Sequence, residues 1–148
     1  MERKAVKSLL LVAALAAAGC ESGRHSASGF RLPPDGDIER GKVAFVALGC
    51  AACHEVSGGD MPRPTVQPPV PVVLGGVLDH EMSDGRLVTS IIYPTFRLAH
   101  YPKSQLVNGG QSRMPPYADQ ITVRQLTDIV AFLQSRYGVR RIPTKYYF

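Results

Sequence analysis

The chain has 148 residues, of which 17 are Lys or Arg and 12 are Asp or Glu, so its formal net charge is +5. Residues 1–19 hold three of the basic residues and one of the acidic residues, and the remaining 129 residues therefore carry a charge of about +3. That length suits one domain of ordinary size, and so small a positive surplus excludes a nucleic-acid-binding protein by composition.

The first 20 residues have the layout of an export signal. Basic residues precede an apolar run over residues 9–18 that is too short to span a bilayer as a mature helix, and small residues then lead to Cys20. The segment resembles the signals of bacterial lipoproteins, which are cut before a cysteine that becomes lipid-modified. This resemblance implies a signal peptide over 1–19 and lipidation of Cys20. The alternative is cleavage nearby, with Cys20 lost or left as a free thiol.

Ser, Gly and Pro dominate residues 20–36, a composition that buries little apolar surface and predicts a flexible tether. His25 within it is expected to be a solvated linker residue. No internal repeat follows. We therefore expect one globular domain over residues 37–138 and a basic, aromatic tail over 139–148.

A first helix is predicted to begin at Asp37, an N-cap residue followed by the negative charge of Glu39 in the first turn. Gly49 suits its end. The apolar positions recur every three or four residues and would share one face: Ile38, Gly41, Phe45 and Leu48.

The helix leads directly into Cys50-Ala51-Ala52-Cys53-His54, the spacing by which proteins attach haem covalently. Each thiol can form a thioether to a haem vinyl group, and the adjacent His54 then falls against the iron. One such motif predicts one haem c.

Other interpretations of this motif need partners elsewhere in the sequence. A structural zinc site needs a second ligand pair, but Cys20 lies in the leader and the remaining histidines, His25, His80 and His100, are isolated. A thioredoxin-like redox pair needs a βαβ pattern, and no run of strands precedes Cys50. The remaining alternative is purely structural: two buried thiols that lie beside a surface histidine.

The rest of the chain predicts a proline-rich loop and two further helices. Residues 57–71 hold too many prolines for a helix or a central strand. A short helix begins at Ser83 and stops at Tyr93 because Pro94 follows, with an apolar face of Leu87, Ile91 and Ile92. The last helix, capped by Thr122, runs from residue 123 to about 137, where Gly138 ends it. Its apolar residues are Leu126, Ile129, Val130, Phe132 and Leu133.

Together these motifs resemble the class I cytochrome c family in its small, lipid-anchored bacterial form. Gly41 and Phe45 match the family's first helix, the haem motif follows, and a Met-Pro segment at Met114 precedes a last helix that matches over residues 128–133. The resemblance covers residues 37–137. It implies an all-α fold in which the first and last helices cross and short helices and loops surround one covalent haem.

The resemblance also implies axial ligands for the iron. His54 is the expected proximal ligand, with its second ring nitrogen bonded to the carbonyl of a loop proline, Pro69 or Pro71. Met114, 60 residues beyond His54 in a Met-Pro segment, is the predicted sixth ligand. Met61 would have to round the macrocycle almost fully extended. Met82 and His80 are expected to be packing or surface residues, and His100 is an alternative ligand.

With both axial positions filled by protein, one-electron transfer between a donor and an acceptor redox protein is the expected function, on the periplasmic side of a membrane that holds the lipid anchor. A haem subunit of a larger periplasmic oxidoreductase, such as one oxidising sulfur compounds, is an alternative. A small-ligand sensor or catalyst is another, if Met114 does not bind iron. The tail either packs back on the domain or docks on an acidic partner or an anionic membrane.

Overall fold

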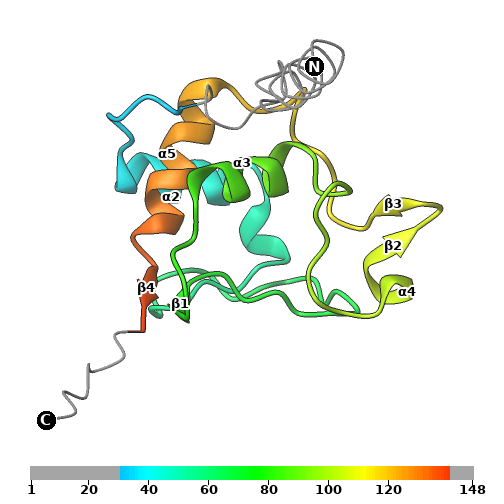
Figure 1. Cartoon of the computed structure of the whole chain (residues 1–148). Helices are drawn as coiled ribbons and strands as arrows, with labels where there is room; N and C mark the ends of the chain where they lie inside the picture. The colour runs from blue at the N-terminus through cyan, green and yellow to red at the C-terminus, as the bar shows by residue number, and fades with distance from the viewer. Residues whose placement is uncertain (1–30, 141–148) are drawn as a thin grey trace, which may run out of the picture. The chain divides into compact units, whose positions relative to one another are not determined.

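The computed structural model describes residues 31–140; the predicted signal peptide over residues 1–19, Cys20, His25 and the tail from residue 141 lie outside the described residues. Within that range the main helices are α2 (Ile38–Ala47), α3 (Asp84–Ile92), α4 (Lys103–Leu106) and α5 (Val123–Gln134), with a 3₁₀ turn η2 (Cys50–Ala52). The strands are short: β1 (Gly76–Leu78), β2 (Val107–Asn108), β3 (Gln111–Ser112) and β4 (Tyr137–Val139) (Figure 1). The prediction of a small, mostly helical fold is confirmed.

The two terminal helices of the domain, α2 and α5, cross at close range. A Cβ atom at Gly41 would run into the backbone oxygen of Asp128 and the side chain of Phe132, so glycine is what allows this approach. The rings of Phe45 and Phe132 meet at the crossing with their centroids 5.7 Å apart, and both are almost completely buried. The predicted crossing of the first and last helices therefore rests on one small residue and one aromatic pair.

The predicted helix starts are present. The Asp37 carboxylate accepts a hydrogen bond from the backbone N–H of Arg40, and the Thr122 hydroxyl accepts one from that of Gln125. The Gln125 side chain bonds back to the backbone of Thr122, which completes a capping box. At the start of α3, the Ser83 hydroxyl likewise accepts a hydrogen bond from the backbone N–H of Arg86. Each cap satisfies backbone donors that the first helical turn leaves without a partner.

A buried carboxylate fastens the start of α2 to α5. Asp128, 3 % exposed, accepts hydrogen bonds from the backbone N–H of Asp37 at 2.9 Å and from Nε of Arg40 at 3.0 Å. The guanidinium of Arg40 holds the pKa of this carboxyl below its usual value. Residues just before the helix also pack here, because Leu32 contacts the core and Arg124 pairs with Asp35 at 3.0 Å. The ordered domain thus includes part of the segment expected to be tether.

The prediction that the last helix continues to Tyr137 and ends at Gly138 is wrong. Helix α5 ends at Gln134, the Ser135 hydroxyl donates to the carbonyl of Phe132, and the chain then enters β4. Strand β4 pairs in parallel with β1, with Tyr137 opposite Gly76. The apolar Tyr137 continues the helical periodicity past the true end of α5. The local sequence does not indicate the strand, because the residue that pairs with Tyr137 lies about 60 residues away in the sequence.

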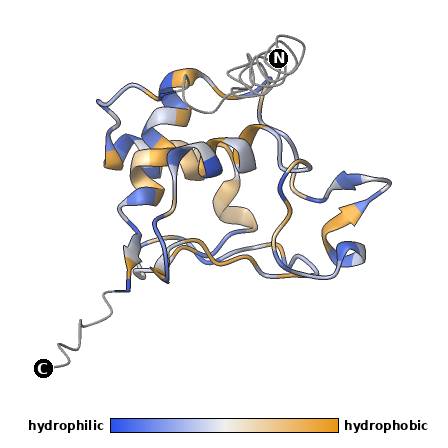
Figure 2. Cartoon of the chain, in the orientation of Figure 1, coloured by the Kyte–Doolittle hydropathy of each residue, from blue (hydrophilic) through white to orange (hydrophobic). Residues whose placement is uncertain are grey.

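The segment from residue 53 to residue 75 contains no helix, as its prolines predict. It is tied down by backbone hydrogen bonds, including those from Thr65 and Val66 to the carbonyl of Ala52, and by the bridge between Val56 and Leu74. Figure 2 shows hydrophobic residues on these loops as well as on the helices. Among residues 31–140, no helix has the length and apolar character needed to cross a membrane.

Candidate haem site

A largely apolar cavity of about 470 Å³ lies between the helices and the loops. Its walls come from the end of α2, the haem motif, the loop over residues 68–75, α3, residues 94–117 and α5. This volume falls in the range of about 300–1,000 Å³ that is typical of small-molecule and cofactor sites. The core of the domain is therefore built around a space that side chains do not fill.

The predicted attachment residues lie together on this cavity. Gly49 takes the left-handed conformation, with φ of 77°, and turns the chain out of α2 into η2. The backbone N–H of His54 then donates to the carbonyl of Cys50 at 3.0 Å. Cys50, Cys53 and His54 all line the cavity, and the two cysteines are not bridged to each other. Burial raises the pKa of the Cys50 thiol.

His54 is oriented by a loop carbonyl, but the predicted partner is wrong. Its Nδ1 atom lies 3.0 Å from the carbonyl oxygen of Val72, not from that of Pro69 or Pro71. The reason is the register of the loop, which the parallel bridge between Val56 and Leu74 fixes. With Nδ1 donating to this carbonyl, the lone pair of Nε2 is left to bind a metal.

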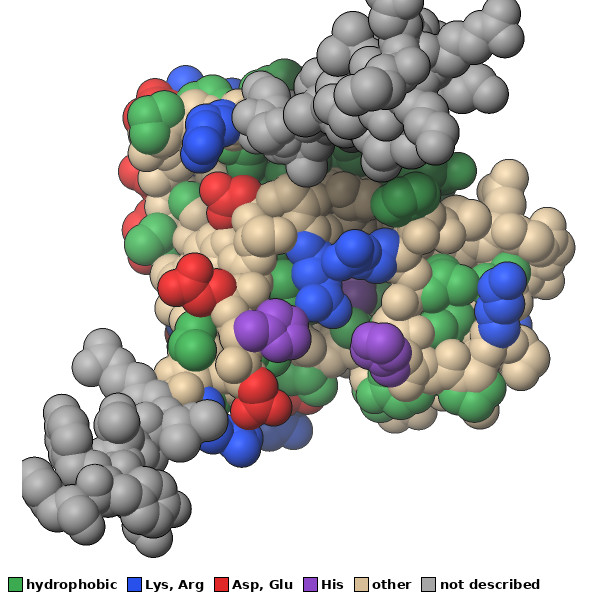
Figure 3. Space-filling view, viewed as in Figure 1, with side chains coloured by type: hydrophobic (Ala, Val, Ile, Leu, Met, Phe, Trp, Pro, Cys, Tyr) green, Lys and Arg blue, Asp and Glu red, His purple; other side chains and the backbone are tan. Residues whose placement is uncertain are grey.

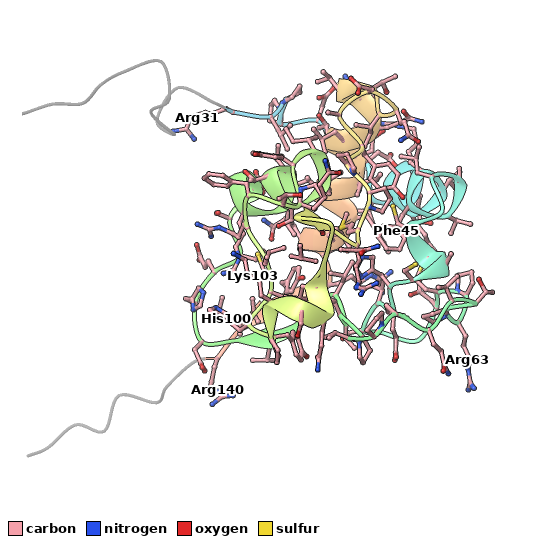
Figure 4. The ribbon with its side chains drawn as sticks, turned by 90° about the vertical axis from the view of Figure 1, so that its right-hand side faces the viewer. Arg31, Phe45, Arg63, His100, Lys103 and Arg140 are labelled. Carbon is pink, nitrogen blue, oxygen red and sulfur yellow. The ribbon has the colours of Figure 1, made fainter. Side chains whose placement is uncertain are left out.

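Met114 lines the same cavity, so the structure brings the predicted sixth ligand to the site of His54. The other candidate sulfur and imidazole ligands differ in whether they reach the cavity. Met82 also lines the cavity, whereas Met61 packs on the core without reaching the cavity wall. His80 and His100 are exposed and lie outside the lining, and Figure 4 shows His100 beside Lys103 at the surface.

Tyr117, three residues after Met114, connects the methionine segment to two helices. Its hydroxyl donates to the carbonyl of Leu48 at the end of α2 at 3.1 Å, and its backbone N–H donates to the carbonyl of Ile91 in α3 at 3.2 Å. Its side chain is buried, which raises the pKa of its phenol. The methionine segment is thereby held against the end of α2, directly before the haem motif.

Three arginines, Arg86, Arg97 and Arg113, also line the cavity, and none forms an ion pair with any residue between 31 and 140. Haem carries two propionate carboxylates on one edge, so an apolar cavity lined with guanidinium groups fits its chemistry. Our sequence reasoning did not identify these arginines. One signal was available, because residues 85–118 contain four cations and no Asp or Glu.

A metal site of the ordinary protein-ligand kind finds no support in the part of the chain that the structure describes. No group of three or more His, Cys, Asp or Glu side chains comes together there. The zinc alternative raised by the cysteine spacing would need such a group.

Comparison with protein families agrees with this site. Residues 38–136 match the family model described as Cytochrome c, which is more than half of the chain. The protein therefore belongs to the cytochrome c family. Its cofactor is covalently attached haem c with its iron, and it is a haem-based electron-transfer protein. In comparisons with curated proteins and with solved structures, nothing matches the chain.

Proposed function

We propose that this protein is a one-electron carrier whose single haem is bound by Cys50, Cys53, His54 and Met114. The observation that carries the proposal is the shared cavity, because these four residues come from two segments about 60 residues apart and line one apolar space. In this proposal Cys50 and Cys53 would hold the haem through thioethers, and His54 and Met114 would hold its iron.

The ligand set decides what chemistry the site supports. When bound, the haem supplies an iron centre that changes oxidation state by one electron. A thioether ligand favours the reduced iron and raises the reduction potential relative to two histidines. If His54 and Met114 both hold the iron, this chain would leave no position on it for a substrate. The protein's own contribution is to orient His54 through Val72, hold Met114 in place and exclude water with apolar walls.

The arginines complete the proposed site. Arg86, Arg97 and Arg113 would pair with the propionates, which removes the cost of placing two carboxylates beside apolar residues. Because these cations have no ion-pair partner within residues 31–140, pairing with the cofactor breaks no existing contact.

The location is proposed from the sequence. An export signal over residues 1–19 and a lipid on Cys20 would place the domain on the periplasmic side of a membrane, where it exchanges electrons with donor and acceptor proteins. A single lipid-modified cysteine at the end of a tether would keep the domain near that surface. A Cys20→Ser variant should then lose the lipid mass and partition into the aqueous phase after detergent extraction.

The ligand assignment is tested by the far-red sulfur-to-iron charge-transfer band of the oxidised, haem-loaded full-length protein. We expect the band in the parent, its loss in Met114→Ala and its retention in Met82→Ala, which removes the other methionine of the cavity. Absence of the band from the parent, or its loss only in Met82→Ala, would overturn the Met114 assignment. Absence from the parent, with an added small ligand then binding the iron, would favour a sensor or catalyst.

A further inference from the structure

A second, smaller cavity lies beside the loop that orients His54. This outer groove has a volume of about 290 Å³, and its apolar walls are three prolines and three valines: Pro64, Pro68, Pro71, Val66, Val72 and Val73. Val66 and Val73 are each 50 % exposed, so these walls meet solvent. Val72 and Val73 line the haem cavity as well. The outer groove and the haem cavity thus share a wall, and that wall includes the residue whose carbonyl faces His54.

The shared wall has little backbone support of its own. Residues 67–73 make no backbone–backbone hydrogen bond with any other described residue, whereas the residues on either side, Val66 and Leu74, bond to carbonyls in or next to the haem motif. The prolines at positions 68, 69 and 71 have no N–H to donate. The position of the wall therefore depends on side-chain packing, which a group seated in the outer groove would complete.

The chain itself contains a segment with the chemistry to fill this groove. Residues 141–148, which we call the strap, lie outside the described residues and have the sequence Arg-Ile-Pro-Thr-Lys-Tyr-Tyr-Phe. Aromatic side chains pack well on proline-rich segments, and Pro68 and Pro71 have the Pro-x-x-Pro spacing that aromatic surfaces recognise. The outer groove therefore offers proline rings to the three consecutive aromatic residues of the strap.

Charge favours the same pairing. Glu55 lines the outer groove, is exposed and forms no ion pair with any residue between 31 and 140, while the strap carries Arg141 and Lys145. By contrast, Figure 3 shows Lys and Arg side chains gathered at the centre of the face that it displays, where a basic segment would be repelled. The outer groove is thus the apolar surface whose charge complements the strap.

The strap is long enough to reach the outer groove. It starts after Arg140, whose N–H donates to the carbonyl of Leu78 at 2.8 Å, and Leu78 is five residues beyond Val73. Five extended residues span at most about 18 Å and paired strands lie about 5 Å apart, so Arg140 is at most about 23 Å from Val73. Eight extended residues span about 26–29 Å. Figure 4 shows Arg140 and Arg63 along the same lower edge of the domain, with no need for the strap to cross the molecule.

We propose that the strap folds back over the outer groove, with its aromatic residues against Pro68, Pro71 and Val73, and that this contact holds the Val72 carbonyl on His54. The strap then acts on the haem site from outside the cavity, as a positioning segment that does not touch the iron. The contact itself is independent of the iron ligands, whereas its effect through His54 rests on the proposed function.

The contact is tested by photocrosslinking in the haem-loaded full-length protein in neutral detergent. Phe148→p-benzoylphenylalanine keeps an aromatic ring in the strap, and mass spectrometry identifies the residues to which it becomes attached. The control carries the same group at Tyr101, which is 49 % exposed between α3 and α4 and does not line the outer groove. We expect intramolecular crosslinks to residues 64–73 from position 148 and none from position 101. Crosslinks from position 148 only to other residues, or only between two copies of the chain, would overturn the proposal.

Hydrogen exchange measures the support that the strap gives to the shared wall. In the triple variant Tyr146→Ala/Tyr147→Ala/Phe148→Ala, the amides of Val72 and Val73 should exchange about fivefold faster than in the parent, while the amides of α5 remain unchanged. Thr144→Ala, which alters the strap without removing a ring, should exchange as the parent does.

A matched pair of valines tests the same contact from the side of the domain. Val66 lines the outer groove but not the haem cavity, so Val66→Ser should also speed exchange at Val72 and Val73. Val43 is 68 % exposed on α2 and lines neither space, and Val43→Ser should leave those amides unchanged. Equal effects of the two substitutions would contradict a contact at the outer groove.

The effect on His54 is read from the reduction potential. A weaker hydrogen bond from Nδ1 to Val72 makes the imidazole a poorer donor to oxidised iron. The triple variant should therefore shift the redox equilibrium constant about twofold toward the reduced form, a rise of about 18 mV in the potential. Thr144→Ala should keep the potential of the parent.

Parent-like exchange in the triple variant would overturn the proposal. If that variant also loses the extra binding of the parent to phosphatidylglycerol vesicles over phosphatidylcholine vesicles, the aromatic residues belong to a membrane contact instead. Faster exchange with an unchanged potential would overturn the effect on His54. Crosslinking and exchange do not depend on the iron ligands, so a parent without the far-red band would count against the proposed function and not against the strap.

Discussion

The helix crossing and the walls of the haem cavity are stabilised in different ways. Where α2 meets α5, side chains interlock around Gly41, backbone donors are capped, and cations have acidic partners. Around the cavity, the backbone over residues 53–75 and 93–102 is largely irregular, arginines lack ion pairs within the described range, and aromatic rings are exposed. The crossing is complete with protein atoms alone, whereas the cavity walls are arranged around a cofactor.

Removing the haem should have the largest effect and should fall mainly on the cavity walls. An apolar cavity of about 470 Å³ left empty would cost at most on the order of 10 kcal/mol, which is comparable with the whole stability of a small domain. A haem-free Cys50→Ser/Cys53→Ser protein should no longer show a cooperative thermal unfolding transition when unfolding is followed by circular dichroism. Residual amide protection, measured by hydrogen exchange, should be higher in α2 and α5 than in residues 57–75. Equal protection in both regions would contradict the comparison.

Truncating one phenylalanine in each region should have the next largest effect and should distinguish the crossing from the cavity walls. Phe132 is fully buried at the crossing, so Phe132→Ala should cost about 3–5 kcal/mol in urea denaturation of the haem-loaded protein. Phe96 is 69 % exposed beside the cavity, and Phe96→Ala should change the free energy of unfolding by less than about 0.5 kcal/mol. Similar losses would mean that the exposed ring is a structural element after all.

A methyl group added at the crossing should cost somewhat less. In Gly41→Ala the new Cβ meets the backbone of Asp128 and the side chain of Phe132, so the helices must separate at a cost of about 2–3 kcal/mol. The control is Gly85→Ala, where the added atom meets nothing within 4 Å and alanine favours the helix. Both free energies come from denaturant titration, and a neutral Gly41→Ala would disprove the close approach.

The buried carboxylate of the crossing should make stability depend on acid pH. The pKa of Asp128 is lowered in the folded state by Arg40, so its ionised form stabilises the fold above the usual value of 3.8, and this contribution is lost as pH falls below that value. Asp60, between Lys42 and Arg136, has its pKa lowered to about 2 and acts in the same direction.

Asp128→Asn should therefore cost about 1–2 kcal/mol at neutral pH, since it weakens charge-assisted hydrogen bonds. The difference between parent and variant should narrow between pH 4 and pH 2, as measured by thermal melts across that range. A difference that stays constant with pH would assign the effect to shape and not to charge.

The smallest expected effect lies at the junction of the two regions. Tyr117→Phe removes the hydrogen bond to Leu48 and should cost about 1 kcal/mol. If this lost free energy destabilises the Met114 segment, added imidazole should replace Met114 on the iron with an apparent affinity about fivefold higher. The disappearance of the far-red band reports this replacement. Tyr137→Phe is the control, because Tyr137 also lines the cavity but its hydroxyl makes no hydrogen bond to residues 31–140. Equal imidazole affinity in both variants would show that Tyr117 does not position the methionine.

Features that depend on a few neighbouring residues were predictable from the sequence. The caps at Asp37, Ser83 and Thr122, the left-handed Gly49 and the stop before Pro94 each follow from local backbone chemistry, and the structure contains all of them. The haem motif belongs to the same group because its spacing is itself the signal.

Features that depend on register between distant segments were not predictable in this way. The bridge between Val56 and Leu74 decides that Val72 faces His54, and a residue count alone does not reveal that bridge. The early end of α5 depends on pairing of β4 with β1. The cavity arginines come from α3 and two loops, and only folding brings them to one space.

The loop after the haem motif is fastened near both of its ends to the region just after α5. Asp60 bonds to Arg136 at 3.0 Å, and β1 pairs with β4. A cut in the backbone between these anchors would leave two polypeptides that the α2–α5 crossing and the Asp60–Arg136 ion pair hold together, while β1 and β4 both belong to the second polypeptide. The first would carry both thiols and His54, and the second would carry Met114 and the cavity arginines. We therefore expect the domain to divide into two complementary fragments. Neither fragment surrounds the cofactor alone, and mixing them should regenerate the cofactor pocket.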